Sequence, residues 1–198
     1  DAVGAHWAQN VANALLAASQ SGLSVTECAD ALSGYAPPPG RGTSETLSLP
    51  GIGEITLIDD AYNANPASMR AALKGLSQRV GTRRLAALGD MREIGDTSAE
   101  EHRNLAGPVV EAGVDGVFLA GAEMQHLSEA LPRDLQQISA QTADELWNQL
   151  QKALRAGDVL LIKGSNASGM GRIADRLRQW SQTAAMGKMD GGSEGLRG

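Results

Sequence analysis

The chain has 198 residues, a formal net charge of −6 and 42% hydrophobic residues, which predicts one folded domain, or one domain and a piece of another. The net negative charge and the lack of a basic stripe argue against nucleic acid as a partner. No apolar run reaches the roughly 20 residues that a membrane span needs, and no signal peptide is visible. We therefore expect a cytoplasmic protein with no membrane partner.

The first forty residues favour two helices. The apolar stripe of the first helix consists of Val11, Leu15 and Leu16. Ser24, followed three residues later by Glu27, is typical of a capping box, and it predicts a second helix that runs to about residue 34. Forty residues are too few for a complete domain, so we expect these helices to belong to a larger unit.

A run of three prolines followed by Gly-Arg-Gly, at residues 37–42, is the best candidate for a domain boundary. The glycine-rich end of the chain lacks apolar spacing and predicts a flexible tail. Because Asp1 is not an initiator methionine, we also expect the natural N-terminus to lie upstream. The predicted divisions are 1–38, a hinge at 39–42, a domain at 43–185 and a tail at 186–198.

Strands and helices alternate from about residue 43. The predicted strands are 55–58, 85–88, 117–119 and 159–162, with a weaker one at 135–138. One predicted helix starts at Pro66. The other predicted helices span 98–112 (with a kink or break at Pro108), 123–130, 142–155 and 170–180. Continuously apolar strands between helices predict an α/β fold with a mainly parallel sheet covered on both faces.

Polar side chains follow several of these strands. The carboxyl ends of parallel strands lie at one edge of a sheet, where α/β proteins bind their ligands. We therefore predict a ligand-binding rim there, made by Asp60, Asn63, Asn65, Asp90, Lys163 and Ser165.

Each of these residues also has a structural interpretation. Asp60 could accept two ribose hydroxyls, or either Asp59 or Asp60 could cap the following helix. Asn63 and Asn65 could serve only the geometry of a turn. Lys163 suits a substrate carboxylate or phosphate, and the alternative is a salt bridge to Asp90.

Two further features bear on the chemistry. Arg41, between two glycines, could bind a phosphate in bidentate fashion or could be a solvated linker charge. Residues 163–169 are similar to a loop that offers backbone N–H groups to an anion, although they are not a Walker A loop. No spacing of His, Cys and Asp supports a metal site.

Several of these segments resemble the Mur ligase family, and its MurF-type members in particular. Residues 59–69 (Asp-Asp-Ala-Tyr-Asn-Ala-Asn-Pro-Ala-Ser-Met) resemble the signature that opens the C-terminal domain of those ligases. Residues 88–102 and 159–165 are similar to two later strand ends of that domain. Residues 10–15 resemble a helix near the end of the central ATPase domain, and residues 39–41 resemble its hinge.

The resemblance implies a Rossmann-like C-terminal Mur ligase domain, preceded at 1–38 by the end of the ATPase domain. It also implies an ATP- and Mg²⁺-dependent ligase that adds D-alanyl-D-alanine to the UDP-N-acetylmuramoyl-tripeptide. In such ligases ATP phosphorylates the precursor carboxylate, and the amine attacks the acyl phosphate. The phosphate-binding loop and magnesium ligands of the family are absent from this sequence, so we expect no catalytic residue, no tightly bound cofactor and no activity in this chain alone.

The resemblance implies roles for individual residues. Asn13 would face the adenine, Asp60 the ribose and Arg41 the phosphates of ATP. The substrate side of the cleft would be formed by Asn63, Asn65, Asp90, Lys163 and Ser165.

Two alternatives stay open at this point. One is another Mur-type ligase, such as one that adds a diamino acid, although residues 62–66 (Tyr-Asn-Ala-Asn-Pro) differ from the Tyr-Ala-His-Thr-Pro typical of that relative. The other is a non-catalytic Rossmann-like binding domain, which would also lack a phosphate-binding loop.

Overall fold

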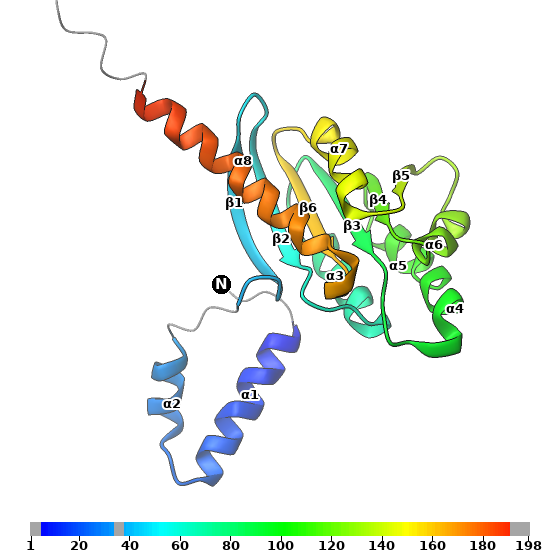
Figure 1. The fold of residues 1–198 in the computed structure, drawn as a ribbon. Helices are drawn as coiled ribbons and strands as arrows, with labels where there is room; N and C mark the ends of the chain where they lie inside the picture. The colour runs from blue at the N-terminus through cyan, green and yellow to red at the C-terminus, as the bar shows by residue number, and fades with distance from the viewer. Residues whose placement is uncertain (1–4, 34–37, 191–198) are drawn as a thin grey trace, which may run out of the picture.

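The computed structural model describes residues 5–33 and 38–190, and Figure 1 shows their arrangement. The strands are β1 (Thr43–Leu49), β2 (Gly53–Asp60), β3 (Arg83–Gly89), β4 (Gly116–Ala120), β5 (Gln136–Ala140) and β6 (Asp158–Lys163). The helices are α1 (Ala5–Gln20), α2 (Val25–Leu32), α3 (Pro66–Ser77), α4 (Ser98–Arg103), α5 (Ala106–Glu111), α6 (Met124–Ala130), α7 (Ala143–Ala153) and α8 (Met170–Asp190). Two short 3-10 turns are η1 (Gly95–Thr97) and η2 (Asn166–Ser168).

The six strands form one sheet in the order β1-β2-β6-β3-β4-β5. All neighbours are parallel except β1 and β2, which are antiparallel, so the predicted α/β fold with a mainly parallel sheet is confirmed. The last strand, β6, lies between β2 and β3. Lys163 at its end is therefore paired with Asp60 on one side and with Leu88 on the other, which brings distant segments of the chain to one edge.

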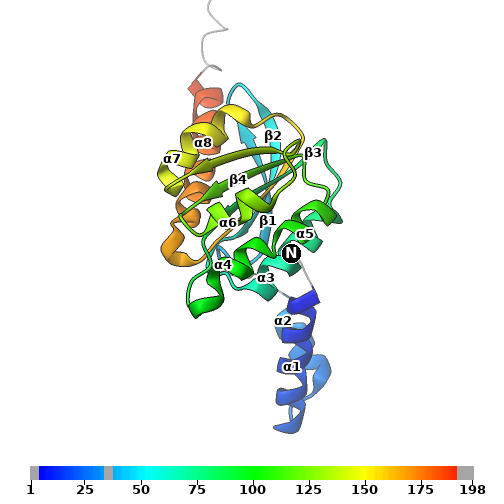
Figure 2. The ribbon, with the colours of Figure 1, turned by 90° about the vertical axis from the view of Figure 1, so that its right-hand side faces the viewer.

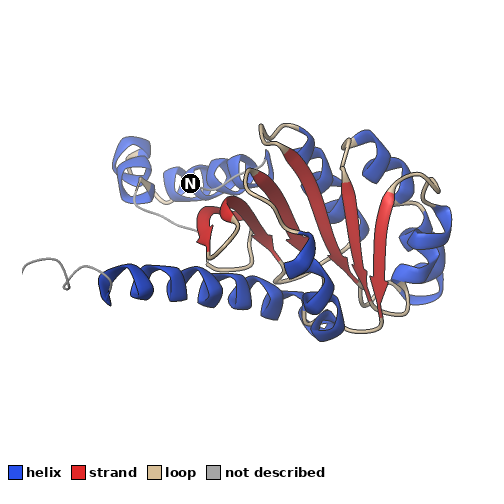
Figure 3. Ribbon diagram, turned by 90° about the horizontal axis from the view of Figure 1, so that it is seen from above, coloured by secondary structure: helices blue, strands red, loops and turns tan. Residues whose placement is uncertain are grey.

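Helices cover both faces of the sheet (Figure 3). On one face the apolar sides of α7 and α8 pack on the strands, through Leu146, Leu150, Ile173 and Leu177. The other face packs against α3, α5 and α6, through Leu73, Leu76, Val109 and Leu127. The buried side chains of both layers are almost all aliphatic, as the low aromatic content requires.

One strand of the sheet is absent from the sequence prediction. In β1 only Leu47 and Leu49 are buried, because this edge strand offers one face to the core and the other to solvent. The turn into β2 contains Gly51 at φ 73°, a backbone conformation that favours glycine.

The predicted helix at 98–112 is interrupted, but not at the proline itself. α4 ends at Arg103, and Pro108 lies in the first turn of α5. A proline ring clashes with the carbonyl four residues earlier, which here belongs to Asn104, so the helix breaks there. Near the end of the chain α8 continues to Asp190, beyond the predicted end at about residue 180, and residues 191–198 of the predicted tail lie outside the described residues.

The first two helices stand apart from the sheet and its covering helices (Figures 1 and 2). Among residues 9–33, whose side chains are described, none is buried, and Leu16, Leu23 and Val25 are more than half exposed. In the described ranges, no helix combines the length and the apolarity that crossing a membrane requires.

Candidate functional site

Adjacent aspartates at the end of β2 bind different partners. The Oδ2 atom of Asp59 accepts a hydrogen bond from Arg178 of α8 at 2.6 Å, and Arg178 also binds Glu45 of β1 at 2.8 Å. Burial lowers the pKa of Arg178, but the hydrogen bonds to Asp59 and Glu45 outweigh it and raise the pKa above the usual arginine value. Asp59 thus joins β2 to α8, whereas Asp60 takes part in another network.

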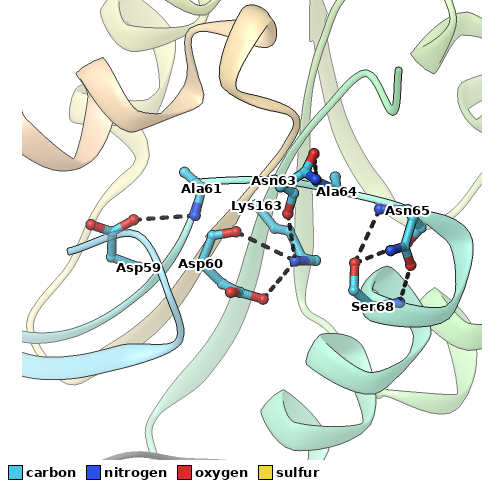
Figure 4. A network of polar contacts seen from close by, with 8 residues as sticks. All are labelled: Asp59, Asp60, Ala61, Asn63, Ala64, Asn65, Ser68 and Lys163. Atoms are coloured by element: carbon cyan, nitrogen blue, oxygen red, sulfur yellow. Dashed lines mark hydrogen bonds and ion pairs between the residues drawn. The ribbon is translucent and has the colours of Figure 1, made fainter. Parts of the chain in front are cut away.

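That second network is centred on Lys163, at the end of β6 (Figure 4). Its ammonium lies 2.6 Å from Oδ2 of Asp60, 3.1 Å from the carbonyl oxygen of Asn63 and 3.4 Å from the carbonyl oxygen of Asp60. The Lys163 side chain is only 1% exposed, while that of Asp60 is 19% exposed. The predicted alternative, a salt bridge between Lys163 and Asp90, is wrong, since the ion pair forms with the aspartate of the neighbouring strand.

The two asparagines that follow β2 shape the turn into α3. Oδ1 of Asn65 accepts a hydrogen bond from the backbone N–H of Ser68 at 2.8 Å, and the Ser68 hydroxyl accepts one from the Asn65 N–H. Asn65 therefore caps α3, and neither Asp59 nor Asp60 does so. Oδ1 of Asn63 accepts from the N–H of Ala64 at 2.8 Å, and both asparagine side chains are exposed at the rim.

A pocket of about 510 Å³ opens beside this network, which is within the usual size range of small-molecule sites. Arg41 enters from the segment before β1, with its guanidinium carbon 3.9 Å from the centre of the Tyr62 ring. Gly40 lies so close to Tyr62 that a β-carbon on residue 40 would lie 3.1 Å from the backbone nitrogen of Tyr62. The residues that line the pocket are Asn10, Gly40, Arg41, Asp60, Tyr62, Asn63, Asn65, Ala67, Ser68, Ala71, Ala72 and Lys163.

Asp90 and Ser165 form a separate cluster between the ends of β3 and β6. The Ser165 hydroxyl donates to the carbonyl oxygen of Asp90 at 2.7 Å, and the Asp90 carboxylate accepts from the N–H of Met124 at 3.1 Å. Both side chains are buried, and neither residue lines the pocket beside Lys163. The predicted rim is therefore divided: four of its six residues line one pocket, while Asp90 and Ser165 join the strand ends next to it.

The remaining predicted features have partners within the chain. Asn13 accepts a hydrogen bond from Gln9 at 3.1 Å and does not line the pocket, whereas Asn10, one turn earlier on α1, does. In the loop after β6, the N–H groups of Ser165, Ser168 and Gly169 donate to backbone carbonyls at 2.9–3.2 Å. Because these three N–H groups already donate within the chain, they do not support the expectation that the loop binds an anion.

A buried histidine supports the Asp90 loop and was not assigned a role from the sequence. His102 is fully buried; its Nε2 accepts from the N–H of Met91 at 3.0 Å, and its Nδ1 lies 2.7 Å from the carbonyl oxygen of Ser98. The Ser98 hydroxyl donates to Glu123 at 2.6 Å, which lowers the pKa of that carboxyl. The spacing of Ser98 and His102 on one helical turn is the only sequence signal for this cluster.

The chemistry of the pocket follows from its lining. Arg41 can bind an anion, Asp60 can accept hydrogen bonds, and Asn63 and Asn65 offer both donors and acceptors. Among the described residues, no group of three or more His, Cys, Asp or Glu side chains is placed to hold a metal ion. The pocket therefore suits a polar ligand that carries both an anionic group and hydroxyl or amine donors.

Comparison with known proteins identifies the family. Residues 47–166 match the family described as Mur ligase, glutamate ligase domain. The chain is 36% identical over 196 residues to the UDP-N-acetylmuramoyl-tripeptide–D-alanyl-D-alanine ligase of Mycobacterium tuberculosis (strain CDC 1551 / Oshkosh), covering 88% of this chain and 38% of that protein. It is 32% identical over 181 residues to the ligase of the same name from Escherichia coli (strain K12), covering 86% of this chain and 37% of that protein.

Solved structures share the fold. A crystal structure of MurF from Acinetobacter baumannii has a TM-score of 0.75 at 29% identity and covers 89% of this chain and 38% of its own. The MurF ligase from Thermotoga maritima, solved in complex with ADP, has a TM-score of 0.72 at 21% identity and covers 92% of this chain and 40% of its own. The chain thus spans less than half the length of these relatives. From the match over residues 47–166 and the shared fold, we conclude that the chain belongs to the Mur ligase family and contains its C-terminal domain.

Proposed function

We propose that this chain is part of an ATP-dependent ligase that adds D-alanyl-D-alanine to a UDP-N-acetylmuramoyl-tripeptide in the cytoplasm. The observation that carries the proposal is the pocket at the ends of β2 and β6, where an arginine, an aspartate and two asparagines lie together. The relatives at 36% and 32% identity bear the name of that ligase, which supports the choice of substrates.

In the proposed ligase, Arg41 and Asp60 belong to the nucleotide side of the cleft. The Arg41 guanidinium binds phosphate oxygens in bidentate fashion, and the Asp60 carboxylate accepts hydrogen bonds from ribose hydroxyls. Asn13, on the exposed surface of α1, would reach the adenine in the complete protein. Bound ATP supplies the phosphoryl group that activates the precursor carboxylate.

The second side of the proposed cleft receives the amine substrate. Asn63 and Asn65 offer amide groups to the dipeptide, and the buried Asp90–Ser165 pair holds the ends of β3 and β6 that frame it. The divisions at 1–38, 39–42, 43–185 and 186–198 belong to the same proposal, with the first segment as the end of the ATPase domain.

The proposal predicts no ligase or ATPase activity for residues 1–198 alone. In-line phosphoryl transfer requires a phosphate-binding loop and magnesium to stabilise the spread negative charge. The sequence contains no Walker A motif, and Mg²⁺ would be held by other parts of the complete ligase.

Nucleotide binding to the complete ligase tests the assignment of the pocket. We expect Asp60→Asn and Arg41→Met each to weaken the binding of ATP by about tenfold or more, measured by isothermal titration calorimetry, since about 1.4 kcal/mol corresponds to a tenfold change. Asp144→Asn, which alters an exposed aspartate on α7 away from the pocket, is the matched control. Unchanged ATP affinity in both pocket variants would overturn the nucleotide assignment.

A further inference from the structure

Lys163 is the most deeply buried cation at the candidate site, and its surroundings determine what it can do. Its side chain is 1% exposed, although the neighbouring Asp60 is 19% exposed and Tyr62 is 52% exposed. A ligand in the pocket would therefore meet Asp60 and Tyr62 before it met the ammonium of Lys163.

The hydrogen-bonding capacity of Lys163 is fully used within the chain. An ammonium has three donors and no acceptor, and three oxygen atoms surround this one. They are Oδ2 of Asp60 at 2.6 Å, the carbonyl of Asn63 at 3.1 Å and the carbonyl of Asp60 at 3.4 Å. A direct contact with substrate would require the ammonium to give up hydrogen bonds to these partners.

We infer that Lys163 is a positioning residue, which fixes the Asp60 carboxylate and the Asn63 turn for the ligand and does not itself bind substrate. β6 brings the lysine to the end of β2, where Asp60 is its register partner. One ammonium thus holds both the carboxylate at the strand end and the backbone of the turn that follows. The inference rests on the proposed function, because it assigns to Lys163 an indirect role in nucleotide binding.

The opposite end of the same strand offers a matched control. Arg83 and Asp158 form a second ion pair, between the first residues of β3 and β6, with Nη2 to Oδ2 at 2.7 Å. The side chains are 17% and 0% exposed, so this pair is also largely buried. Breaking this pair should lower stability, as breaking any buried pair does. The pair lies at the opposite end of β6 from the pocket, so its loss should not affect the ligand.

Steady-state kinetics of the complete ligase separate positioning from contact. We expect Lys163→Met to raise KM for ATP by about tenfold, the equivalent of about 1.4 kcal/mol, because the Asp60 carboxylate is no longer held in place. Arg83→Met should lower the melting temperature but leave KM for ATP unchanged. If Lys163→Met does not fold, Lys163→Gln, whose amide keeps a donor, serves for the same comparison.

A double-mutant cycle with Asp60→Asn then tests whether Lys163 acts through Asp60. We expect the double variant Lys163→Met/Asp60→Asn to have a KM for ATP within about twofold of that of Asp60→Asn alone. If the effects of the two substitutions on KM for ATP multiply instead, the positioning role is overturned and direct contact between Lys163 and the nucleotide is favoured. Asp60→Asn without any effect on KM for ATP would instead overturn the proposed nucleotide site, and the inference with it.

Discussion

The carboxylate of Asp90, after β3, lies directly against the backbone of Gly121, after β4, in the space that a side chain at residue 121 would occupy. Gly121 also has φ 119°, a conformation that other residues rarely adopt. From there the Asp90 carboxylate accepts the N–H of Met124 at the start of α6. Asp90 thus joins the two strand ends, and it can do so because residue 121 has no β-carbon.

Gly121→Ala should therefore destabilise the domain by about 2 kcal/mol or more, because it combines backbone strain with overlap at Asp90. Urea denaturation measures the free energy of unfolding. Gly75→Ala, in α3, is the control, since no heavy atom outside its own helix backbone and chain neighbours lies within 4 Å of the added carbon. The control should match the native chain or exceed its stability by up to about 1 kcal/mol. Equal losses in both variants would contradict this explanation of Gly121.

Arg178→Met should lower the free energy of unfolding by about 2–4 kcal/mol, because it leaves the buried Asp59 carboxylate without its cation. The Arg178 side chain is 23% exposed and that of Asp59 only 3%. Arg172→Met removes an exposed pair with Asp144, where the two side chains are 59% and 51% exposed, and should change stability by no more than about 0.5 kcal/mol. Similar values for the two variants would show that the Asp59 pair is not buried in solution.

Ser98→Ala should raise the pKa of Glu123 toward the ordinary glutamate value. The Ser98 hydroxyl is the largest cause of the lowered pKa. Burial of Glu123 raises the pKa, while His102, His126 and Arg92 lower it to a smaller extent. Because the folded-state pKa is lowered, ionised Glu123 stabilises the fold at neutral pH. That contribution is lost as the pH falls through the lowered pKa, below the usual glutamate range.

The ¹³C shift of the Glu123 carboxyl, followed against pH, measures this directly. Thr97→Ala is the control, since the Thr97 hydroxyl donates to the carbonyl of Ile94 and not to Glu123. An unchanged Glu123 titration in Ser98→Ala would remove the hydroxyl as the cause of the shift.

Deletion of residues 1–38 should change the free energy of unfolding by no more than about 1 kcal/mol. None of the described side chains of residues 9–33 is buried, so removing them takes little apolar contact from the sheet domain. Urea denaturation of the shortened chain, compared with the full chain, gives the difference. A loss of several kcal/mol, or loss of a cooperative transition, would contradict the proposed division at residues 39–42.

Apolar patterning was sufficient to predict most of the sheet. β3, β4 and β6 are continuously apolar because helices cover both of their faces, and that pattern is visible in the sequence. The cap predicted at Ser24 is confirmed as well, with the N–H of Glu27 as the donor, and in the structure Thr142 caps α7 in the same way. β1 escaped prediction because five of its seven residues are polar and its stabilisation comes from pairing with β2, which is not a local property.

The candidate site was predicted only in part. The strand ends did meet at one edge, as parallel topology requires, but the order of the strands decided which residues became partners. Because β6 lies between β2 and β3, Lys163 reaches Asp60, and Ser165 reaches Asp90. The exposure of each side chain also depends on this packing, so the sequence could not tell that Lys163 would be almost fully buried while Asp60 stays partly exposed.

The ligation reaction itself is the most direct test of the proposed function. The complete ligase should be assayed with ATP, Mg²⁺ and the UDP-N-acetylmuramoyl-tripeptide, together with either D-alanyl-D-alanine or a single diamino acid, while released phosphate is measured and the product mass is determined. We predict phosphate release and a pentapeptide product with the dipeptide alone, at an ordinary enzymatic rate of about 1 per second or more. Product formation with the diamino acid in place of the dipeptide, or no product with either, would contradict the assignment.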